Sequence, residues 1–228
     1  MSTLGIIMSS LMIITGIVFA TMPERHRRTV SIVLSLFLFL YKLTEYTIFG
    51  LTMQLDKIPL EFSTITYFVY SITVLFQIKS MRSIAAFMGF ISGIGYLITF
   101  MMMGTTFYAI NGFYITTMAF INHSIVFLGS MLLIKDVKMH QQEVKKIMTF
   151  SMIYVIYVAL MDQFIEFSQP FIFIRLLLGG NILSELIKAE SPSSYLYLLY
   201  FVSVFMIYRI AILIFQAICN LSHRNLEV

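Results

Sequence analysis

The chain has 228 residues, of which 59% are hydrophobic and 11% are charged, and its formal net charge is +4. Soluble domains carry about 25% charged residues, so this composition excludes a soluble globular fold. The basic residues do not cluster as a nucleic-acid-binding face requires, and no nucleic-acid partner is expected. We predict an all-α, polytopic membrane bundle in which residues 1–228 form a single transmembrane domain.

Seven apolar runs approach or reach the length of about 20 residues that a helix needs to cross a bilayer. The first run has no basic residue before it and is followed directly by a basic stretch, which favours a span over a cleaved signal peptide. The short connections favour antiparallel neighbours. In chain order, the predicted spans are Leu4–Met22, Thr29–Gly50, Pro59–Ile78, Ile84–Met103, Gly112–Ile134, Lys146–Gln163 and Ser193–Phe215.

The basic residues divide unequally between the two sides of this bundle. The first, third and fifth connections and the C-terminal tail carry ten Lys and Arg residues, whereas the other three connections carry three. Because cytoplasmic loops are enriched in Lys and Arg, this distribution predicts an outside N-terminus and an inside C-terminus. We expect a multi-pass protein of the cell (plasma) membrane.

The sixth connection differs from the others. Residues 164–192 are partly apolar and are interrupted by Pro and Gly. Within them, residues 171–178 are too short to span, and residues 181–188 have the pattern of a short amphipathic helix with Asn181 as its N-cap. We predict a partly buried or interfacial outer segment, and an ordinary surface loop is the alternative.

Ionisable residues within or at the edge of the spans indicate where a site would lie, because a charge in hydrocarbon is costly. Lys42 and Glu45 stand three residues apart in the outer half of the second span, so they share a helix face and can pair. Glu61 and Ser63 begin the third span at the outer edge. Arg209 is placed deeper, toward the cytoplasm.

Further polar residues fall at related depths. Asp162 and Glu166 close the sixth span at the outer edge, and His123 lies near mid-membrane. This convergence predicts an outward-facing polar cavity, with Lys42, Glu45, Glu61 and Glu166 as substrate-binding residues. The alternative is a set of separate ion pairs and helix-end carboxylates in the headgroup zone, with no shared site.

His123 lies in Phe120-Ile121-Asn122-His123-Ser124-Ile125, where three polar side chains interrupt an apolar helix. A lone buried His is more often a hydrogen-bonded structural residue than a base. An unpaired imidazole at mid-membrane depth is costly, however, which favours a functional role. Both interpretations stay open.

Four motifs occur in order along the chain from about Arg25 onward. They are Ile58-Pro59-Leu60-Glu61-Phe62-Ser63, Gly89-Phe90-Ile91-Ser92-Gly93, Phe120-Ile121-Asn122-His123 and Ser191-Pro192-Ser193-Ser194-Tyr195-Leu196-Tyr197. Their order and spacing resemble the YwaF family of bacterial multi-pass membrane proteins, which is similar to an animal transmembrane acyltransferase that remodels ether phospholipids. The first motif is similar to the family's Leu-Pro-Leu-His-Leu-Cys, the second to its Gly-rich span, the third to its aromatic segment ending in His, and the fourth to its Pro-containing entry to the last span.

The resemblance implies a seven-span bundle in which Ser63 and His123 match a Cys and a His thought to carry an acyl group. Ser63 stands where the family has the Cys, and Glu61 stands where it has the preceding His. A hydroxyl is a weak nucleophile that needs an adjacent base. With Asp162 orienting His123, the expected catalytic residues are Ser63, His123 and Asp162. The predicted depths leave about 10 Å between Ser63 and His123.

Three functions are compatible with these observations. The first is acyl transfer between phospholipids, with Lys42 as an electrostatic partner for phosphate or oxyanion. The second is a membrane binding or transport subunit for a small cationic or zwitterionic solute. The third is a non-catalytic family member. Membrane lipid is the expected partner, protein partners are not indicated, and no cofactor or metal set is indicated, since Cys219 is the single cysteine.

Overall fold

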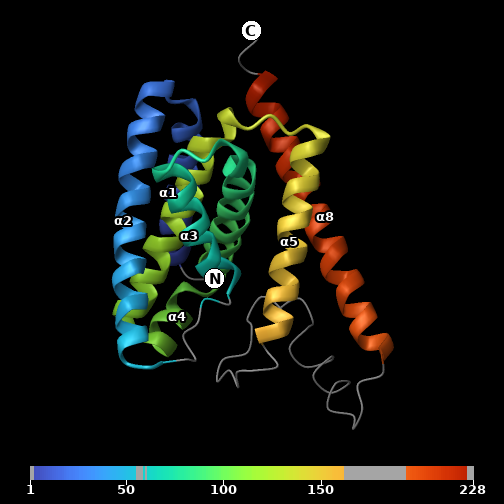
Figure 1. The fold of residues 1–228 in the computed structure, drawn as a ribbon. Helices are drawn as coiled ribbons and strands as arrows, with labels where there is room; N and C mark the ends of the chain where they lie inside the picture. The colour runs from blue at the N-terminus through green and yellow to red at the C-terminus, as the bar shows by residue number, and fades with distance from the viewer. Residues whose placement is uncertain (1–2, 55–58, 60, 162–193, 225–228) are drawn as a thin grey trace.

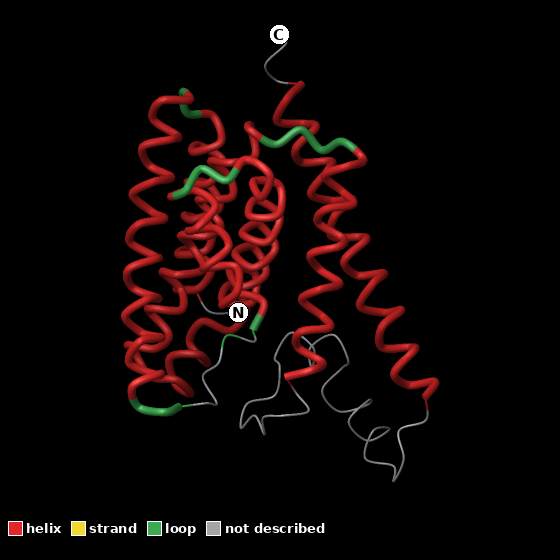
Figure 2. Tube along the Cα trace, in the orientation of Figure 1, coloured by secondary structure: helices red, strands yellow, loops and turns green. Residues whose placement is uncertain are grey.

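The computed structural model is all-α in the part of the chain that it describes, which is residues 3–54, 59, 61–161 and 194–224. Two short 3-10 turns, η2 (Lys79–Met81) and η3 (Ile134–Asp136), flank one of the helices. Figure 1 shows α1 to α4 as one group with α5 and α8 beside it, and Figure 2 shows short loops between the described helices. The six described helices are α1 (Thr3–Thr21), α2 (Glu24–Leu51), α3 (Phe62–Leu75), α4 (Arg82–Leu133), α5 (Gln141–Met161) and α8 (Ser194–Arg224).

Helix α4 is a hairpin. Its backbone breaks at Gly112, where φ is 76° and ψ is 173°, a conformation that glycine adopts without the steric penalty of a Cβ. The limbs before and after this residue run antiparallel. Near the open end the Ser130 hydroxyl donates to the Ala86 carbonyl, and near the turn the Thr116 hydroxyl donates to the Phe107 carbonyl. Counted by limb, the described residues contain seven helical segments.

The two ends of the bundle differ in charge. Helix α2 begins, α3 ends and both limbs of α4 terminate at the same end, where α5 also begins and α8 ends (Figure 1). We call this the basic end, and we call the opposite end, where α2 ends and α3 begins, the far end. The residues that gather at the basic end include Arg25, Arg27, Arg28, Lys79, Arg82, Lys135, Lys138 and Lys145.

Small residues make the closest helix contacts. On α1, Gly5 and Gly16 are buried, and a Cβ added to either would overlap the Phe100 carbonyl or the Phe127 ring of α4. Leu11 is exposed on the same helix. Small residues inside and large aliphatic residues outside are typical of helices that pack within a bilayer, where lipid gives no hydrophobic drive to association.

The two limbs of α4 approach each other in the same way. Gly89 and Gly93 lie one helical turn apart, and a Cβ on Gly89 would lie 2.8 Å from the Val126 carbonyl oxygen. A Cβ on Gly93 would lie 2.8 Å from the Phe127 Cα. This close approach fixes His123, which is on the second limb, against the first limb.

Four helical stretches in the described residues are long and apolar enough to cross a membrane. Their surfaces expose large apolar side chains such as Ile14 on α1 and Leu40 on α2. Such continuous apolar surface is rare on soluble monomers. By length and composition, these are the features of a helical membrane protein. The stretches are Thr3–Thr21, Glu24–Leu51, Lys79–Asp136 and Phe205–Ser222.

Several helices extend beyond the predicted spans. The first limb of α4 continues past Met103 toward Gly112, and α8 continues past Phe215 to Arg224. Hydropathy marks the part of a helix that suits hydrocarbon, whereas backbone hydrogen bonding carries the helix on through polar residues. The predicted outer segment, residues 164–192, lies outside the described residues.

Candidate functional site

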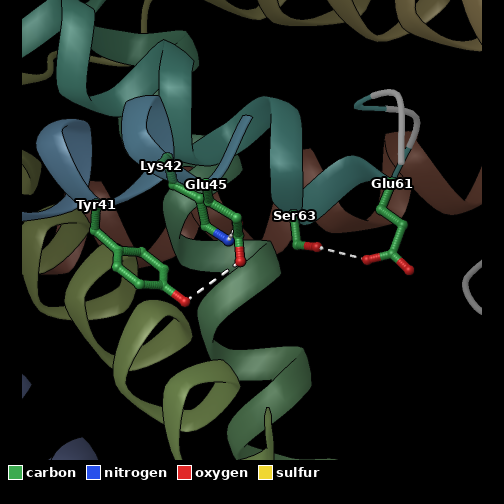
Figure 3. Close-up of polar contacts among 5 residues, drawn as sticks. All are labelled: Tyr41, Lys42, Glu45, Glu61 and Ser63. Atoms are coloured by element: carbon green, nitrogen blue, oxygen red, sulfur yellow. Dashed lines mark hydrogen bonds and ion pairs between the residues drawn. The ribbon is translucent and has the colours of Figure 1, made fainter. Parts of the chain in front are cut away.

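Lys42 and Glu45 form an ion pair in the far half of α2. The Lys42 Nζ donates to Glu45 Oε2 at 2.6 Å, and the Tyr41 hydroxyl donates to Glu45 Oε1 at 3.3 Å. Lys42 is only 8% exposed, and its ammonium lies 4.8 Å from the centroid of the Tyr67 ring. Figure 3 shows Tyr41 and Lys42 both directed at the Glu45 carboxylate. The three-residue spacing therefore gives the pairing that it predicts.

Glu61 and Ser63 stand at the start of α3. The Ser63 hydroxyl donates to Glu61 Oε2 at 3.3 Å, and Figure 3 shows it directed at that carboxylate. Glu61 precedes the first residue of the helix and is exposed. An acid at this position is favoured by the positive end of the helix dipole.

His123 is held by three neighbours. Its Nδ1 lies 3.2 Å from the Ser92 carbonyl oxygen, and the Tyr96 ring stacks on the imidazole at 4.1 Å between centroids. The Tyr67 ring meets it edge-on at 5.6 Å. A carbonyl oxygen only accepts hydrogen bonds, so the contact with the Ser92 carbonyl uses a proton on Nδ1, and the Ser92 hydroxyl lies 3.4 Å from the same nitrogen.

Tyr67 links these groups. It is 5% exposed and contacts both Lys42 and His123. Four side chains from α2, α3 and both limbs of α4 therefore stand in a row, in the order Lys42, Tyr67, His123 and Tyr96. We call this row, together with Tyr41 and Glu45, the far-end cluster. The sequence offers no signal for Tyr67 beyond its place one helical turn after Ser63.

No hydrogen bond joins Ser63 to His123 in the part of the chain that the structure describes. Ser63 donates to Glu61, the His123 Nδ1 faces Ser92, and the Tyr67 ring contacts the His123 ring. Asp162 and Glu166 lie outside the described residues. Arg209 is exposed on α8. Within the described ranges, no group of three His, Cys, Asp or Glu side chains is placed to hold a metal ion.

An apolar crevice of about 420 Å³ lies beside α3. Phe68 in its wall makes an edge contact with Tyr46 of α2, at 5.4 Å between centroids. The crevice lies on the face of α3 opposite to Ser63 and Tyr67. Its lining is Pro59, Ile65, Phe68, Val69, Ile72, Met81 and Tyr157.

Comparison of this chain with protein-family models, with curated proteins and with solved structures gives no match. The site must therefore be interpreted from its own chemistry.

Proposed function

We propose that this protein is a seven-span membrane protein of the plasma membrane, with its N-terminus outside, that binds a zwitterionic lipid at the far-end cluster. Two helical limbs of α4 and the helices α1, α2, α3, α5 and α8 supply the seven crossings. The concentration of Lys and Arg at the basic end supports an inside position for that end. The far-end cluster then faces the outer leaflet.

One observation carries this proposal: the far end holds both signs of charge within one small region. Lys42 is buried, whereas about 27% of the Glu45 side chain and much of Glu61 reach the surface. An ammonium has three N–H donors, and Glu45 takes one from Lys42. Lys42 therefore retains donors for a lipid phosphate, and the Glu61 carboxylate suits the amine of the same headgroup.

The Tyr rings support the same ligand. Lys42 lies over Tyr67 and 5.2 Å from the centroid of Tyr41, so the cluster already uses aromatic faces to stabilise a cation in a partly dry site. The apolar crevice on the other face of α3 suits an aliphatic chain, but it is not continuous with the cluster.

Acyl transfer is a second candidate, supported by the resemblance to the YwaF family. It requires the Ser63 hydroxyl to leave Glu61 and reach the His123 imidazole. A Ser63→Ala variant that keeps full transfer between phospholipid and lysophospholipid would exclude this chemistry. The lipid-binding proposal does not depend on that outcome.

Binding is measured on the purified full chain in detergent, with dioctanoyl phosphatidylethanolamine and dioctanoyl phosphatidylglycerol as probes. The two lipids share their tails, and only the first has an amine. We expect tighter binding of phosphatidylethanolamine and about tenfold weaker binding of it to Glu61→Gln, since a hydrogen bond to a charged group contributes about 1.5–3 kcal/mol.

Glu143→Gln is the matched control, because Glu143 is an acid at the basic end, away from the far-end cluster. It should leave phosphatidylethanolamine binding unchanged. Equal binding of the two lipids, or equal loss in Glu61→Gln and Glu143→Gln, contradicts the proposal.

A further inference from the structure

A second polar site lies at the basic end, away from every residue of the far-end cluster. A cavity of about 540 Å³ opens there between the start of α2, the end of α3 and both ends of α4. This volume is within the range of small-ligand sites. Four basic and two acidic residues line it, a surplus of two positive charges. The sequence assigns these cations only to membrane topology.

Arg27 in the cavity wall is buried and only partly bonded. It is 8% exposed, and its Nη1 donates to the Leu132 carbonyl while its Nη2 donates to Asp136 Oδ1, both at 3.1 Å. Its Nε has no hydrogen-bond partner among the described residues. One buried donor of a charged group is therefore unused.

Thr73 in the same wall carries a second unused donor. It is 1% exposed, and its Oγ1 has no hydrogen-bond partner among the described residues. Thr66, two turns earlier on α3, instead donates to the Phe62 carbonyl at 2.7 Å. Buried polar groups are nearly always satisfied, so an unpaired pair of donors on one cavity wall indicates an acceptor that fills the cavity.

The other cations at the cavity decide the charge of that acceptor. Arg28 donates to Gln77 Oε1 at 3.0 Å, so its charge meets a neutral partner, and Lys79 and Arg82 approach from the connection into α4. Guanidinium groups match phosphate oxygens in geometry. Donors arriving from several helices suit a tetrahedral anion better than a planar carboxylate.

We propose that the basic-end cavity binds a phosphate group, presented either by an anionic lipid headgroup or by a soluble phosphate. The ligand accepts hydrogen bonds from Arg27 Nε and Thr73 Oγ1 in the wall, while Arg28, Lys79 and Arg82 neutralise its charge. The site differs from the far-end cluster in position and in sign of charge, so neither proposal depends on the other.

The test measures binding to the full chain in detergent by thermal shift and by native mass spectrometry. The probes are inorganic phosphate, dioctanoyl phosphatidic acid and, as a neutral-headgroup control, dioctanoyl phosphatidylcholine. Binding of both phosphate probes supports a general phosphate site. Binding of phosphatidic acid alone supports a lipid headgroup, and binding of inorganic phosphate alone supports a soluble ligand.

The double variant Arg28→Gln, Lys79→Gln changes two exposed residues and should weaken binding of the phosphate probe about tenfold or more. Lys138→Gln, Lys145→Gln is the charge-matched control, because both residues are exposed at the same end and neither lines the cavity. It should weaken binding less than threefold, through long-range charge that salt screens.

Thr73→Val removes only the unused hydroxyl from a buried side chain of nearly the same shape. We expect several-fold weaker binding with no loss of stability in the unliganded protein. Phosphate binding that neither method detects, or that falls equally in the cavity and control double variants, overturns the proposal. Unchanged affinity in Thr73→Val removes Thr73 from the site and overturns the role assigned to its hydroxyl.

Discussion

The far-end cluster and the basic-end cavity are both polar, but they use their polar groups differently. At the far end, Lys42 is already bonded to Glu45 and covered by an aromatic ring. At the basic end, the buried donors of Arg27 and Thr73 are unused, and positive charge is in surplus. A polar group within hydrocarbon must find its partner in the protein, whereas one at the membrane edge can be completed by a ligand. Breaking the Lys42–Glu45 pair should therefore change stability, whereas removing an unused donor at the basic end should change binding.

The largest expected effect is at Lys42. Lys42→Met leaves the Glu45 carboxylate without its cation, and we expect a loss of about 3 kcal/mol in the free energy of unfolding. This is the low end of the range for a broken buried pair, because about 27% of the Glu45 side chain is exposed. Unfolding of the detergent-solubilised protein measures the loss.

The double variant Lys42→Met, Glu45→Gln is the control for that loss. Removing both charges should recover most of the stability, because no uncompensated charge then remains. If Lys42→Met is as stable as the parent, the Lys42–Glu45 pair does not stabilise the far half of the bundle. The contrast drawn between the far-end cluster and the basic-end cavity would then be wrong.

The next effect concerns the contact that positions His123. Gly93→Ala places a methyl group against the Phe127 backbone and the His123 carbonyl, and should cost about 1–3 kcal/mol. Gly95→Ala is the matched control, because a Cβ there meets nothing within 4 Å. Removing a helical glycine at such a site stabilises by about 0.5–1 kcal/mol. The thermal midpoint should fall in Gly93→Ala and rise in Gly95→Ala. Equal falls in both variants contradict close packing of the limbs.

The smallest effect is a pH dependence at the basic end. Glu143, in the first turn of α5 before the predicted span, accepts hydrogen bonds from Ser83 and Lys146. Partial burial raises the pKa of Glu143, but these hydrogen bonds and the Lys146 charge outweigh it and hold the pKa below its usual range. A lowered folded-state pKa stabilises above the unfolded value of about 4.3, and this contribution is lost as pH falls through the folded value.

Glu143→Gln tests this contribution. The thermal midpoints of parent and variant should differ most near neutral pH and converge as pH falls below the unfolded value of about 4.3 and through the lowered folded value, where the parent carboxylate is protonated. The difference should stay below about 1 kcal/mol, because solvent screens a partly exposed pair. Parallel midpoint curves across this range would show that the Ser83 and Lys146 contacts do not stabilise the carboxylate.

Local spacing predicts the contacts that lie on one helix. The Lys42–Glu45 pair follows from a separation of three residues, which a helix converts into a shared face. The segments near Leu4–Met22 and Ile84–Met103 follow from apolar length alone, since few polar residues interrupt them. In each case the deciding interaction is between residues close in sequence.

Contacts between helices depend on rotation about the helix axes, which spacing does not specify. Ser63 and His123 differ in predicted depth by about 10 Å, but nothing in the sequence shows that the Tyr67 ring contacts His123. The basic-end cavity also results from packing between helices, which spacing along the chain does not specify. Arg27, Thr73 and Leu132 are far apart in the chain, and only the packing of α2, α3 and α4 brings them to one cavity.

The break at Gly112 has a consequence for assembly. It connects two long helical limbs through a single non-helical residue, so their pairing closes almost no loop and costs little chain entropy. The contacts between limbs are local in the sense that governs folding speed. We expect this hairpin to form before helices that are distant in sequence join it, and to act as the template on which α1 docks through Gly5 and Gly16.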